Sequence, residues 1–327
     1  AAFDPTAVAG FGKDQVASFD PTAVAGFGKE QVAGFDPTAV AGFGKDQVAG
    51  FDPAAMAGFG KDHLAAFDPT VMGGLGKEQV AGFDPTAVAG LGQDHFKSFD
   101  KEAVAGFGKD HVAAFDPAAM AAFDKDQFAA FDPAAMAGFG KDHLAAFDPT
   151  VMGGLGKEQV AGFAPTAVAG LGQDHFKSFD KEALAGFGKD HVAAFDTSLI
   201  DAFDKEKIGA FDPKAMAGFT TDHISALDPT VVGGLGKDQV AGFSPNVVGR
   251  FSTKQLAEFD PKAVAGFEKD HVAEFDAAAM EGFDPTHVAA FDAEAMAGFK
   301  GQTLKGLDPE SFAAVTPDQL AKMAPDA

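Results

Sequence analysis

An unbroken eight-residue repeat constrains this chain more than any other feature. Counted from Phe3, the sequence divides into forty complete octads plus five residues, without one insertion or deletion. Position 1 is Phe in 32 of the 40 octads, position 6 is always Val, Met, Leu, Ile or Phe, and all 18 prolines stand at position 3. Such strict phase indicates that each octad is one structural step.

The columns of the octad favour one short helix per octad. A continuous α-helix does not fit, because eight residues at 100° each drift by about 80° per octad and Pro interrupts the hydrogen-bond ladder. Strands fit less well, because the period-two alternation is missing. Asp at position 2, as in Asp4 and Asp20, suits an N-cap, and Pro suits the first helical position. We expect glycines such as Gly10 and Gly26 to end the helix in a left-handed conformation.

Ser or Thr replaces Asp at the expected cap of four octads: Thr220, Ser244, Ser252 and Thr316. These residue types share with Asp a side-chain oxygen acceptor and little else. The substitution pattern therefore supports the capping interpretation.

Two kinds of octad alternate along the chain. Odd octads, counted from Phe3, mostly carry Asp-Pro, and even octads mostly carry Gly-Lys, as in "FDPTAVAGFGKDQVAG" at 35–50. Helices this short are unstable alone and must be held by stacking. The alternation predicts a coil of two octads, or 16 residues, and about twenty coils in an elongated rod of roughly 160–200 Å. Positions 1 and 6 would fill the interior, while Ala and Gly at positions 7 and 8 would allow close approach of the backbones. The predicted fold class is an all-α repeat solenoid.

A longer repeat, of ten octads, lies above the single octads. Residues 51–114 recur at 131–194, with only Asp84 becoming Ala164 and Val104 becoming Leu184. Diverged copies begin near 211 and 291. Because the copies differ in position by an even number of octads, we take the pair of octads as the structural unit. We predict a single continuous solenoid over residues 1–327.

Composition excludes several classes of protein. The chain has no Cys, which rules out disulfides and thiolate metal sites. Its formal net charge of -23 argues against nucleic acid as a partner. No apolar run approaches the roughly 18 residues of a membrane helix, so we expect no membrane-spanning segment. A start at "AAFDP" and an end at "MAPDA" suggest a processed product or a piece of something longer.

Histidine is confined to one column. All nine His stand at position 5 of even octads, a column they share with Gln. In coils of two octads, some of them would lie in neighbouring coils on one side, as a metal-binding or pH-responsive stripe. The favoured alternative is an exposed polar position at which Gln and His are interchangeable. No third ligand repeats with them, so no metal site is predicted, and the candidate ligands are confined to His95, His111, His175, His191, His271 and His287.

Acidic residues also form columns, at position 2 of odd octads and position 4 of even ones. Calcium needs six to eight oxygen ligands, and the position-2 carboxylates are already assigned as caps. We therefore predict no cofactor, and keep calcium as the alternative. We also predict that the chain is not an enzyme, because near-identical units offer no unique asymmetric pocket.

Stretches such as "FDPTAVAG" and "VTPDQLAK" resemble the tandem octads of L-T-x-x-Q-V-A-A type found in very large bacterial secreted and surface proteins, some of them adhesin-like. The resemblance covers essentially the whole chain. It implies a bacterial, extracellular or cell-surface location and a spacer, stalk or surface-layer role, with no catalytic residues to carry over.

Our hypothesis from the sequence is a structural repeat protein that forms an elongated spacer or stalk, or the self-assembling filament subunit of a bacterial surface assembly. The expected partner is a second copy of the chain. Two alternatives remain open: a calcium-responsive adhesin segment, and a solenoid module that binds peptides or glycans.

Overall fold

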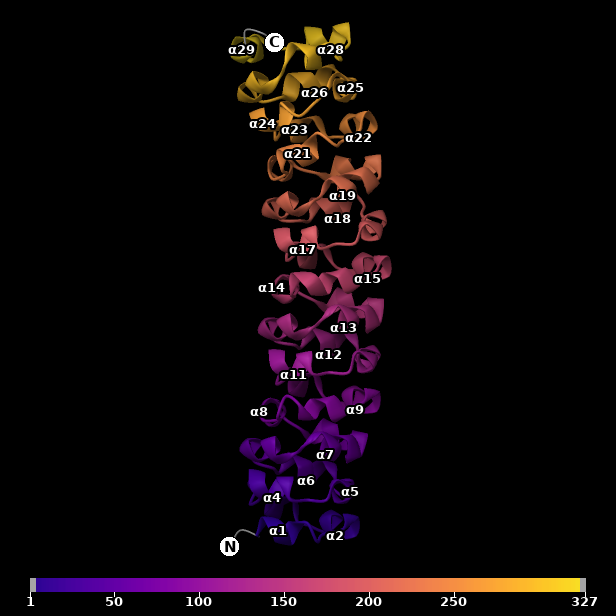
Figure 1. Ribbon diagram of the computed structural model, residues 1–327, viewed down its shortest axis with the longest axis vertical. Helices are drawn as coiled ribbons and strands as arrows, with labels where there is room; N and C mark the ends of the chain where they lie inside the picture. Colours follow the sequence, from indigo (N-terminus) through magenta and orange to yellow (C-terminus); the bar gives the residue numbers. More distant parts are fainter. Residues whose placement is uncertain (1–3, 324–327) are drawn as a thin grey trace. The chain divides into compact units, whose positions relative to one another are not determined.

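The computed structural model describes residues 4–323, and helices are the only regular secondary structure in that range. Each octad contributes one short helix, as predicted. The chain divides into two compact units, unit 1 at residues 1–171 and unit 2 at residues 172–327. Within each unit the helices are stacked in successive coils (Figure 1). The predicted all-α repeat solenoid is therefore confirmed.

The helices of unit 1 are, in odd octads, α1 (Pro5–Val8), α3 (Pro21–Val24), α5 (Pro37–Val40), η1 (Pro53–Gly58), η2 (Pro69–Gly74), η3 (Ala87–Gly90), α10 (Lys101–Val104), η4 (Pro117–Ala122), η5 (Pro133–Gly138), η6 (Pro149–Gly154) and η7 (Pro165–Gly170). In even octads they are α2 (Lys13–Ala17), α4 (Lys29–Ala33), α6 (Lys45–Ala49), α7 (Lys61–Ala66), α8 (Lys77–Ala81), α9 (Gln93–Ser98), α11 (Lys109–Ala113), α12 (Lys125–Ala129), α13 (Lys141–Ala146) and α14 (Lys157–Gly162).

The helices of unit 2 are, in odd octads, α16 (Lys181–Leu184), η8 (Thr197–Ala202), η9 (Pro213–Gly218), η10 (Pro229–Gly234), α21 (Pro245–Val248), α23 (Pro261–Val264), α25 (Ala277–Met280), η11 (Ala293–Gly298) and α28 (Pro309–Ala313). In even octads they are α15 (Gln173–Ser178), α17 (Lys189–Ala193), α18 (Lys205–Gly209), α19 (Thr221–Ala226), α20 (Lys237–Ala241), α22 (Thr253–Ala257), α24 (Lys269–Val272), α26 (Pro285–Ala290), α27 (Gly301–Leu304) and α29 (Pro317–Lys322). All 3₁₀ helices, labelled η, fall in odd octads.

Asp at position 2 caps most helices of the odd octads, although Asp100 and Asp180 make no cap hydrogen bond. The carboxylate of Asp36 accepts the backbone N–H of Thr38 at 2.8 Å and the Thr38 hydroxyl at 2.6 Å, while Pro37 is the first helical residue. The predicted caps are thus confirmed. Of the four Ser and Thr substitutes, Thr220, Ser252 and Thr316 accept a cap hydrogen bond, whereas Ser244 makes none.

One coil contains three octads, so the prediction of two is wrong. Helix α4 packs on η1, which follows it by three octads, and the same spacing joins α13 to η7 and, in unit 2, α17 to η9. Three helices enclose an interior that aromatic side chains can fill, whereas two helices packed directly on each other enclose none. At three octads per coil, the twenty-one octads of unit 1 make seven coils, so the expected total of about twenty coils is also wrong.

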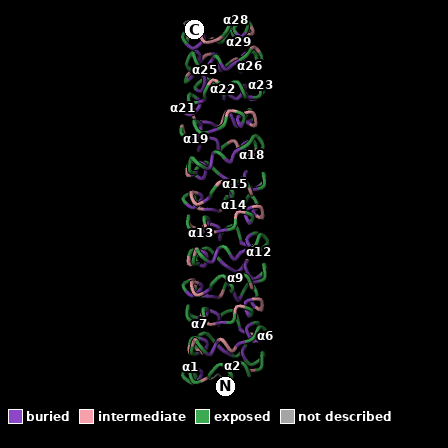
Figure 2. The backbone as a smooth tube through the Cα atoms, turned by 90° about the vertical axis from the view of Figure 1, so that its right-hand side faces the viewer, coloured by how far each residue is buried: buried purple, intermediate pink, exposed green. Residues whose placement is uncertain are grey.

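Phe at position 1 fills this interior. Successive rings meet edge to face, with centroids 5.4 Å apart for Phe27 and Phe35 and 5.5 Å apart for Phe35 and Phe43. Rings one coil apart also meet, at 6.4 Å for Phe27 and Phe51. Edge-to-face geometry is the favourable arrangement for aromatic quadrupoles. Position 6 is buried beside the rings, as at Val40, so the predicted core is confirmed (Figure 2).

The alternation of octads follows from the odd number of octads in a coil. Because the octad stacked on any other lies three octads along the chain, an odd octad always meets an even one. The longer repeat contains ten octads, which preserves the alternation although it is not a whole number of three-octad coils. A longer repeat must therefore contain an even number of octads so that unlike octads stay stacked. This even number does not give the number of octads in a coil.

Glycine at position 8 allows close approach of two coils, as expected. The separate expectation that glycine ends the helix in a left-handed conformation is wrong. No described glycine has a positive φ. A Cβ built on Gly58 would lie 2.2 Å from the carbonyl oxygen of Lys29, and one on Gly90 would lie 2.1 Å from that of Lys61. Both distances are shorter than any real contact, so a larger residue must push the coils apart.

The residue at position 8 of an odd octad varies with the residue at position 3 of the octad stacked beneath it. In unit 1, Gly pairs with Lys at Lys13–Gly42, Lys29–Gly58, Lys45–Gly74, Lys61–Gly90, Lys77–Gly106, Lys109–Gly138, Lys125–Gly154 and Lys141–Gly170. Where Gln93 replaces Lys, Ala122 replaces Gly, and Gln93 Nε2 donates to the carbonyl of Ala118 at 2.8 Å. Unit 2 repeats this with Gln173 and Ala202. This pairing at a distance in sequence independently supports the three-octad coil.

We expect Gly58→Ala to lower the free energy of unfolding by about 1–3 kcal/mol, the usual cost of overpacking. Combined with Lys29→Gln, its cost should fall by at least about 0.5 kcal/mol, because contacting residues couple in double-mutant cycles. Urea denaturation of the four proteins measures both values. Gly10→Ala is the matched control, since a Cβ there meets only the Ala7 carbonyl oxygen, at 3.6 Å. Equal losses from Gly10→Ala and Gly58→Ala would contradict the close-approach explanation.

Candidate functional site

The polar column at position 5 of the even octads lies between coils. Gln47 is 6% exposed and His63 is 9% exposed, and the other members of the column in the interior coils are similarly buried. The expectation of an exposed polar position is therefore wrong. The equivalent position of the odd octads holds Ala, Val or Leu in every case except Ser311, so the polar side chain comes from the even octad wherever an even octad stacks on an odd one.

Glutamine in this column joins two coils through both ends of its amide. Gln47 Oε1 accepts the N–H of Gly44 at 2.8 Å, which closes the start of its own helix α6. Gln47 Nε2 donates to the carbonyls of Phe19 at 2.7 Å and Val16 at 2.9 Å, both in the preceding coil. One side chain thus satisfies a helix N-terminus and two backbone carbonyls of a neighbouring coil.

Histidine makes the same pair of interactions with its two ring nitrogens. His63 Nδ1 accepts the N–H of Gly60 at 3.0 Å, and Nε2 lies 2.8 Å from the carbonyl oxygen of Phe35. A backbone N–H can only donate, so Nδ1 must carry a lone pair and Nε2 must carry the hydrogen. His95, His111 and His143 have the same two partners, a cap N–H and a Phe carbonyl. Gln and His are interchangeable here because both place an acceptor and a donor at the same two points.

Other side chains take this role at three octads. Lys207 Nζ donates to the carbonyl of Lys177 at 3.1 Å, Thr303 Oγ1 donates to Phe275 at 3.0 Å, and Ser311 Oγ donates to Phe283 at 3.1 Å. The link to the preceding coil is kept in each case. We name the whole set, at position 5, the intercoil ladder.

The histidines expected to lie together as pairs do not form a stripe. His95 binds the carbonyl of Phe67, and His111 binds that of Phe83. Because each octad stacks on the third octad before it, two octads of the same kind that follow each other lie on different sides of the coil. The other two predicted pairs, His175 with His191 and His271 with His287, are also two octads apart, so their members lie on different sides of the coil as well. In residues 4–323 no group of three or more His, Asp or Glu side chains is placed to hold a metal ion.

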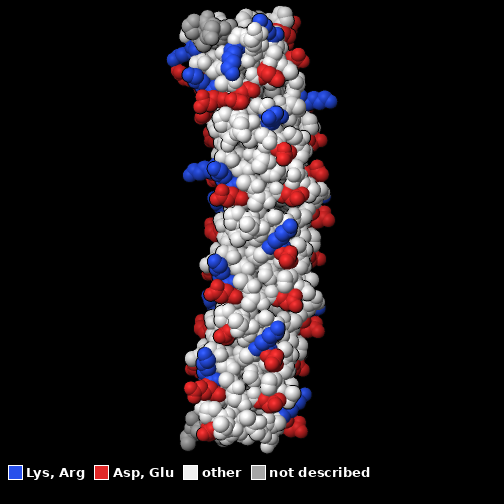
Figure 3. All heavy atoms as spheres, viewed as in Figure 1, with Lys and Arg blue, Asp and Glu red and all other residues white. Residues whose placement is uncertain are grey.

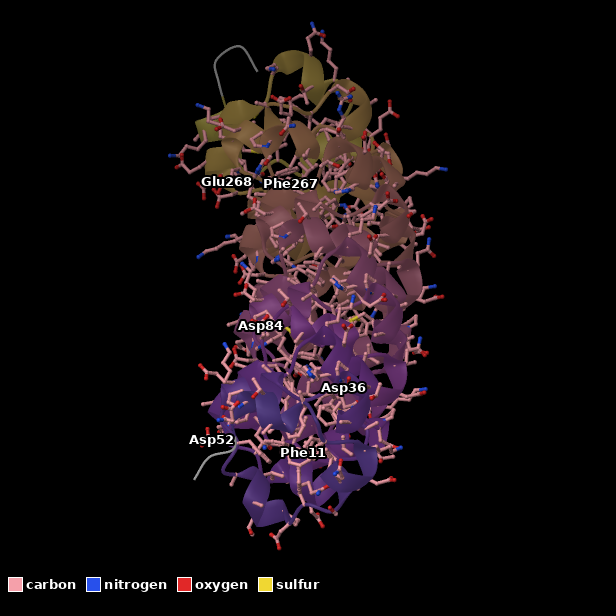
Figure 4. All side chains as sticks on the ribbon, turned by 60° about the horizontal axis from the view of Figure 1, so that its bottom comes forward. Phe11, Asp36, Asp52, Asp84, Phe267 and Glu268 are labelled. Carbon is pink, nitrogen blue, oxygen red and sulfur yellow. The ribbon has the colours of Figure 1, made fainter. Side chains whose placement is uncertain are left out.

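The acidic column at position 2 is engaged in capping. The Thr38 hydroxyl, followed by the Thr38 backbone N–H, lowers the pKa of the Asp36 carboxyl below its ordinary value. The same two donors from the following Thr lower the pKa of Asp68, Asp84 and Asp228. Asp52 and Asp84 lie at the edge of unit 1 (Figure 4). These carboxylates are charged and exposed, with one oxygen committed to the helix start.

Shallow grooves recur where an even octad begins beneath the cap of an odd octad. In unit 1, a groove of about 300 Å³ is lined by residues 25–29 together with Asp52, Ala54 and Ala55. A smaller one of about 110 Å³ lies at residues 91–93 beside Asp116. In unit 2, the equivalent groove of about 360 Å³ contains Glu268, Asp292 and Glu294. None of these three grooves is lined by His, Ser or Thr.

The charged side chains are mixed in sign on the visible face of each unit, with Lys beside Asp or Glu over a largely uncharged surface (Figure 3). Within residues 4–323 no helix has both the length and the apolar character to cross a membrane.

Comparison with known proteins adds no relative: no protein-family model matches the chain, and no curated protein matches it.

Sequence reasoning found the Gln and His column but not what it does. The signal that could have revealed it is the restriction of polar residues to even octads, with Ala at the same position of nearly every odd octad. Exposed columns have no reason to differ in this way. A strict difference indicates that the two octad types contribute differently to one buried interface.

Replacing Gln47 by Leu should lower the free energy of unfolding by about 1–3 kcal/mol for each backbone group left buried and unpaired. Gln47→His at pH 7.5 should stay within about 0.5 kcal/mol of the wild type, because neighbouring octads use His with the same partners. Chemical denaturation of the three proteins measures the difference. If Leu and His have the same effect, the intercoil ladder does not stabilise the stack.

Proposed function

We propose that this chain is a structural repeat protein that acts as an elongated spacer or stalk of a bacterial extracellular surface assembly. The observation that carries the proposal is the uniform intercoil interface. The same Phe core, Gly approach and polar ladder recur from coil to coil in each unit, and one kind of groove recurs in both units. The bacterial and extracellular location comes from the resemblance of the octads.

The function of a spacer depends on its length. The uniform interface determines which changes of length preserve the stacking. Any even number of octads can be added or removed while every stacked pair still joins an odd octad to an even one. Each coil adds an axial rise of about 8–10 Å, the usual separation of packed helices. Length can therefore change without a new kind of contact.

Two internal deletions test this proposal. Deletion of residues 83–130 removes six octads and preserves the alternation, and it keeps Lys61 beneath Gly138 and Lys77 beneath Gly154. We expect a folded chain whose maximum dimension, measured by small-angle X-ray scattering, is shorter by about 16–20 Å. Deletion of residues 91–130 removes only five octads but stacks odd octads on odd ones at the junction. This smaller deletion should cost at least about 1–3 kcal/mol, because ladder partners are lost.

The larger deletion thus serves as the matched control for the smaller one. If both deletions destabilise the chain equally, alternation is not what the stack requires. If the six-octad deletion leaves the maximum dimension unchanged, the chain does not act as a linear spacer.

One observation favours filament formation as the second candidate. Phe312 is 49% exposed and Leu320 is 53% exposed, although position 6 is buried in every other described octad. In the preceding coils such side chains are covered by the octads that follow them. In α2 of the first coil, Gln15 is exposed, while the equivalent Gln47 is buried against the preceding coil. In a protein of residues 1–327, Phe312 and Leu320 of one copy and Gln15 of another are chemically suited to repeat the internal interface, and such a head-to-tail contact does not close.

We expect residues 1–327 to associate reversibly as concentration rises, with light-scattering mass above that of the monomer. Phe312→Ser with Leu320→Ser should weaken the association at least tenfold, because about 1.5 kcal/mol or more is lost for each large side chain that is no longer buried. A serine at a buried position 6, such as Phe96, would disturb the core and cannot serve as the control. The control is therefore Lys97→Ser, at an exposed residue. Monomer mass at every concentration would overturn the filament candidate and leave the spacer proposal intact.

A further inference from the structure

We propose that the histidines of the intercoil ladder make the stack acid-sensitive, so that proton uptake below about pH 6.5 separates coils that are joined at neutral pH. The inference concerns four members of unit 1, His63, His95, His111 and His143. It does not depend on the spacer proposal, because it concerns only the stability of the coils.

Each of these rings is held by two backbone groups that fix it in the neutral state. For His111, the N–H of Gly108 donates to Nδ1 at 3.0 Å, and Nε2 lies 2.9 Å from the carbonyl oxygen of Phe83. His143 makes the same bonds to Gly140 at 2.9 Å and Phe115 at 2.9 Å. All four rings are less than a tenth exposed. Both backbone partners are fixed in character, one as a donor and one as an acceptor.

A proton can be added only at Nδ1, because Nε2 already carries hydrogen. The new N–H would point at the N–H of the cap glycine, so the cap hydrogen bond is lost and two donors face each other. The ring would also carry a positive charge in a buried site whose nearest partners are uncharged. Both effects favour a state in which the ring reaches water, and that state requires the coils to part.

The helices packed against these rings bring no charged side chain that would compensate. Helix α7 of His63 packs against α5 and η3, whose residues are Pro, Thr, Ala, Val and Gly. Helices α9, α11 and α13 pack against η2, η4, η5 and η7, whose residues are likewise uncharged. On their own helices, the residues at positions 3 and 4, such as Lys61 and Asp62, are exposed.

The charged groups that act on the rings are the cap carboxylates of the preceding coil. Asp36 interacts with His63, Asp68 with His95, and Asp84 with His111. These carboxylates are solvent-exposed and already bonded to a Thr hydroxyl and N–H, so water and salt screen their attraction. They soften the effect of protonation but supply no hydrogen bond at Nδ1.

His287 in unit 2 provides an internal contrast. Its cap residue is Asp284, whose Oδ1 lies 2.9 Å from Nδ1. A protonated His287 can donate to this carboxylate, so its protonation forms an ion pair where the cap glycines offer only a donor. We therefore exclude His287 from the acid-sensitive set.

The sign of the pH dependence follows from proton linkage. Protonation of a stacked ring breaks the cap hydrogen bond at Nδ1, whereas an imidazole in an unfolded chain takes up a proton below about pH 6.5 without such a loss, so unfolding binds protons. Each of the four histidines should reduce the folding equilibrium constant by up to about tenfold per pH unit below that value. The cap carboxylates act in a separate window. Because hydrogen bonds from Thr lower the pKa of Asp36 and Asp68, the stability they contribute is present above about pH 4 and lost only at more acid pH.

The test uses the full chain with His63, His95, His111 and His143 all changed to Gln, the residue that occupies the same column in neighbouring octads. Urea denaturation followed by circular dichroism at pH 7.5, 6.5, 5.5 and 5.0 gives the folding equilibrium constant of each protein. We expect similar constants at pH 7.5. Between pH 6.5 and 5.5 the wild type should fall by at least a hundredfold more than the variant. His287→Gln is the matched control and should not diminish the fall of the folding equilibrium constant between pH 6.5 and 5.5, because protonated His287 has Asp284 as a partner.

Equal pH dependence of the wild type and the four-histidine variant would overturn the proposal. If the variant does not fold, nitrogen chemical shifts of the wild-type rings provide the second measurement. We expect the neutral tautomer with hydrogen on Nε2 to persist for as long as the coils remain folded. Folded protein that contains charged imidazolium at these four positions would also overturn the proposal.

Discussion

Stacking of unlike octads is the interaction on which the rest of the structure depends. A helix of four to six residues cannot persist by itself, because nucleation costs more than so few hydrogen bonds return. Each helix of the interior coils is held at both of its stacked faces, by an octad of the other type. The even octad supplies the side chain that crosses the interface, and the odd octad supplies the carbonyl that receives it, as Gln47 and Phe19 show.

Odd and even octads have different roles at the interface, and these roles explain their different sequences. An odd octad needs no polar bridge, so position 5 can be Ala, and its helix is capped by Asp and fixed by Pro at the first turn. An even octad uses position 5 both to cap itself and to reach the coil before it, so Gly suffices at position 2. The close approach at Gly58 then brings the backbones near enough for the Phe rings to interlock. Polar bridge, glycine contact and aromatic core are three parts of one interface.

Much of this fold could be predicted from the sequence, because its local rules act within one octad. The period, the Asp caps and the Phe core depend on neighbours along the chain, and each is visible in a single column. The number of octads per coil depends on contacts between octads that lie three apart, which no single column contains. The alternation of odd and even octads suggested a coil of two octads. The same alternation also occurs when a coil contains three octads. The pairing of Lys29 with Gly58, and of Gln93 with Ala122, contains the missing information, because it links positions that touch only in a three-octad coil.

The candidate site was harder to predict for a related reason. A column that alternates Gln with His looks like a tolerant surface position, since both residues are polar and common on surfaces. Burial gives the same column a strict meaning: the side chain must present an acceptor to a cap N–H and a donor to a carbonyl one coil away. Gln and neutral His satisfy this requirement equally well, so both persist at neutral pH. They differ only when a proton is added, because the amide of Gln47 cannot become a cation and the ring of His63 can. The mixture of the two residues along the ladder therefore sets how many interfaces respond to acid, while leaving the packing of the coils the same.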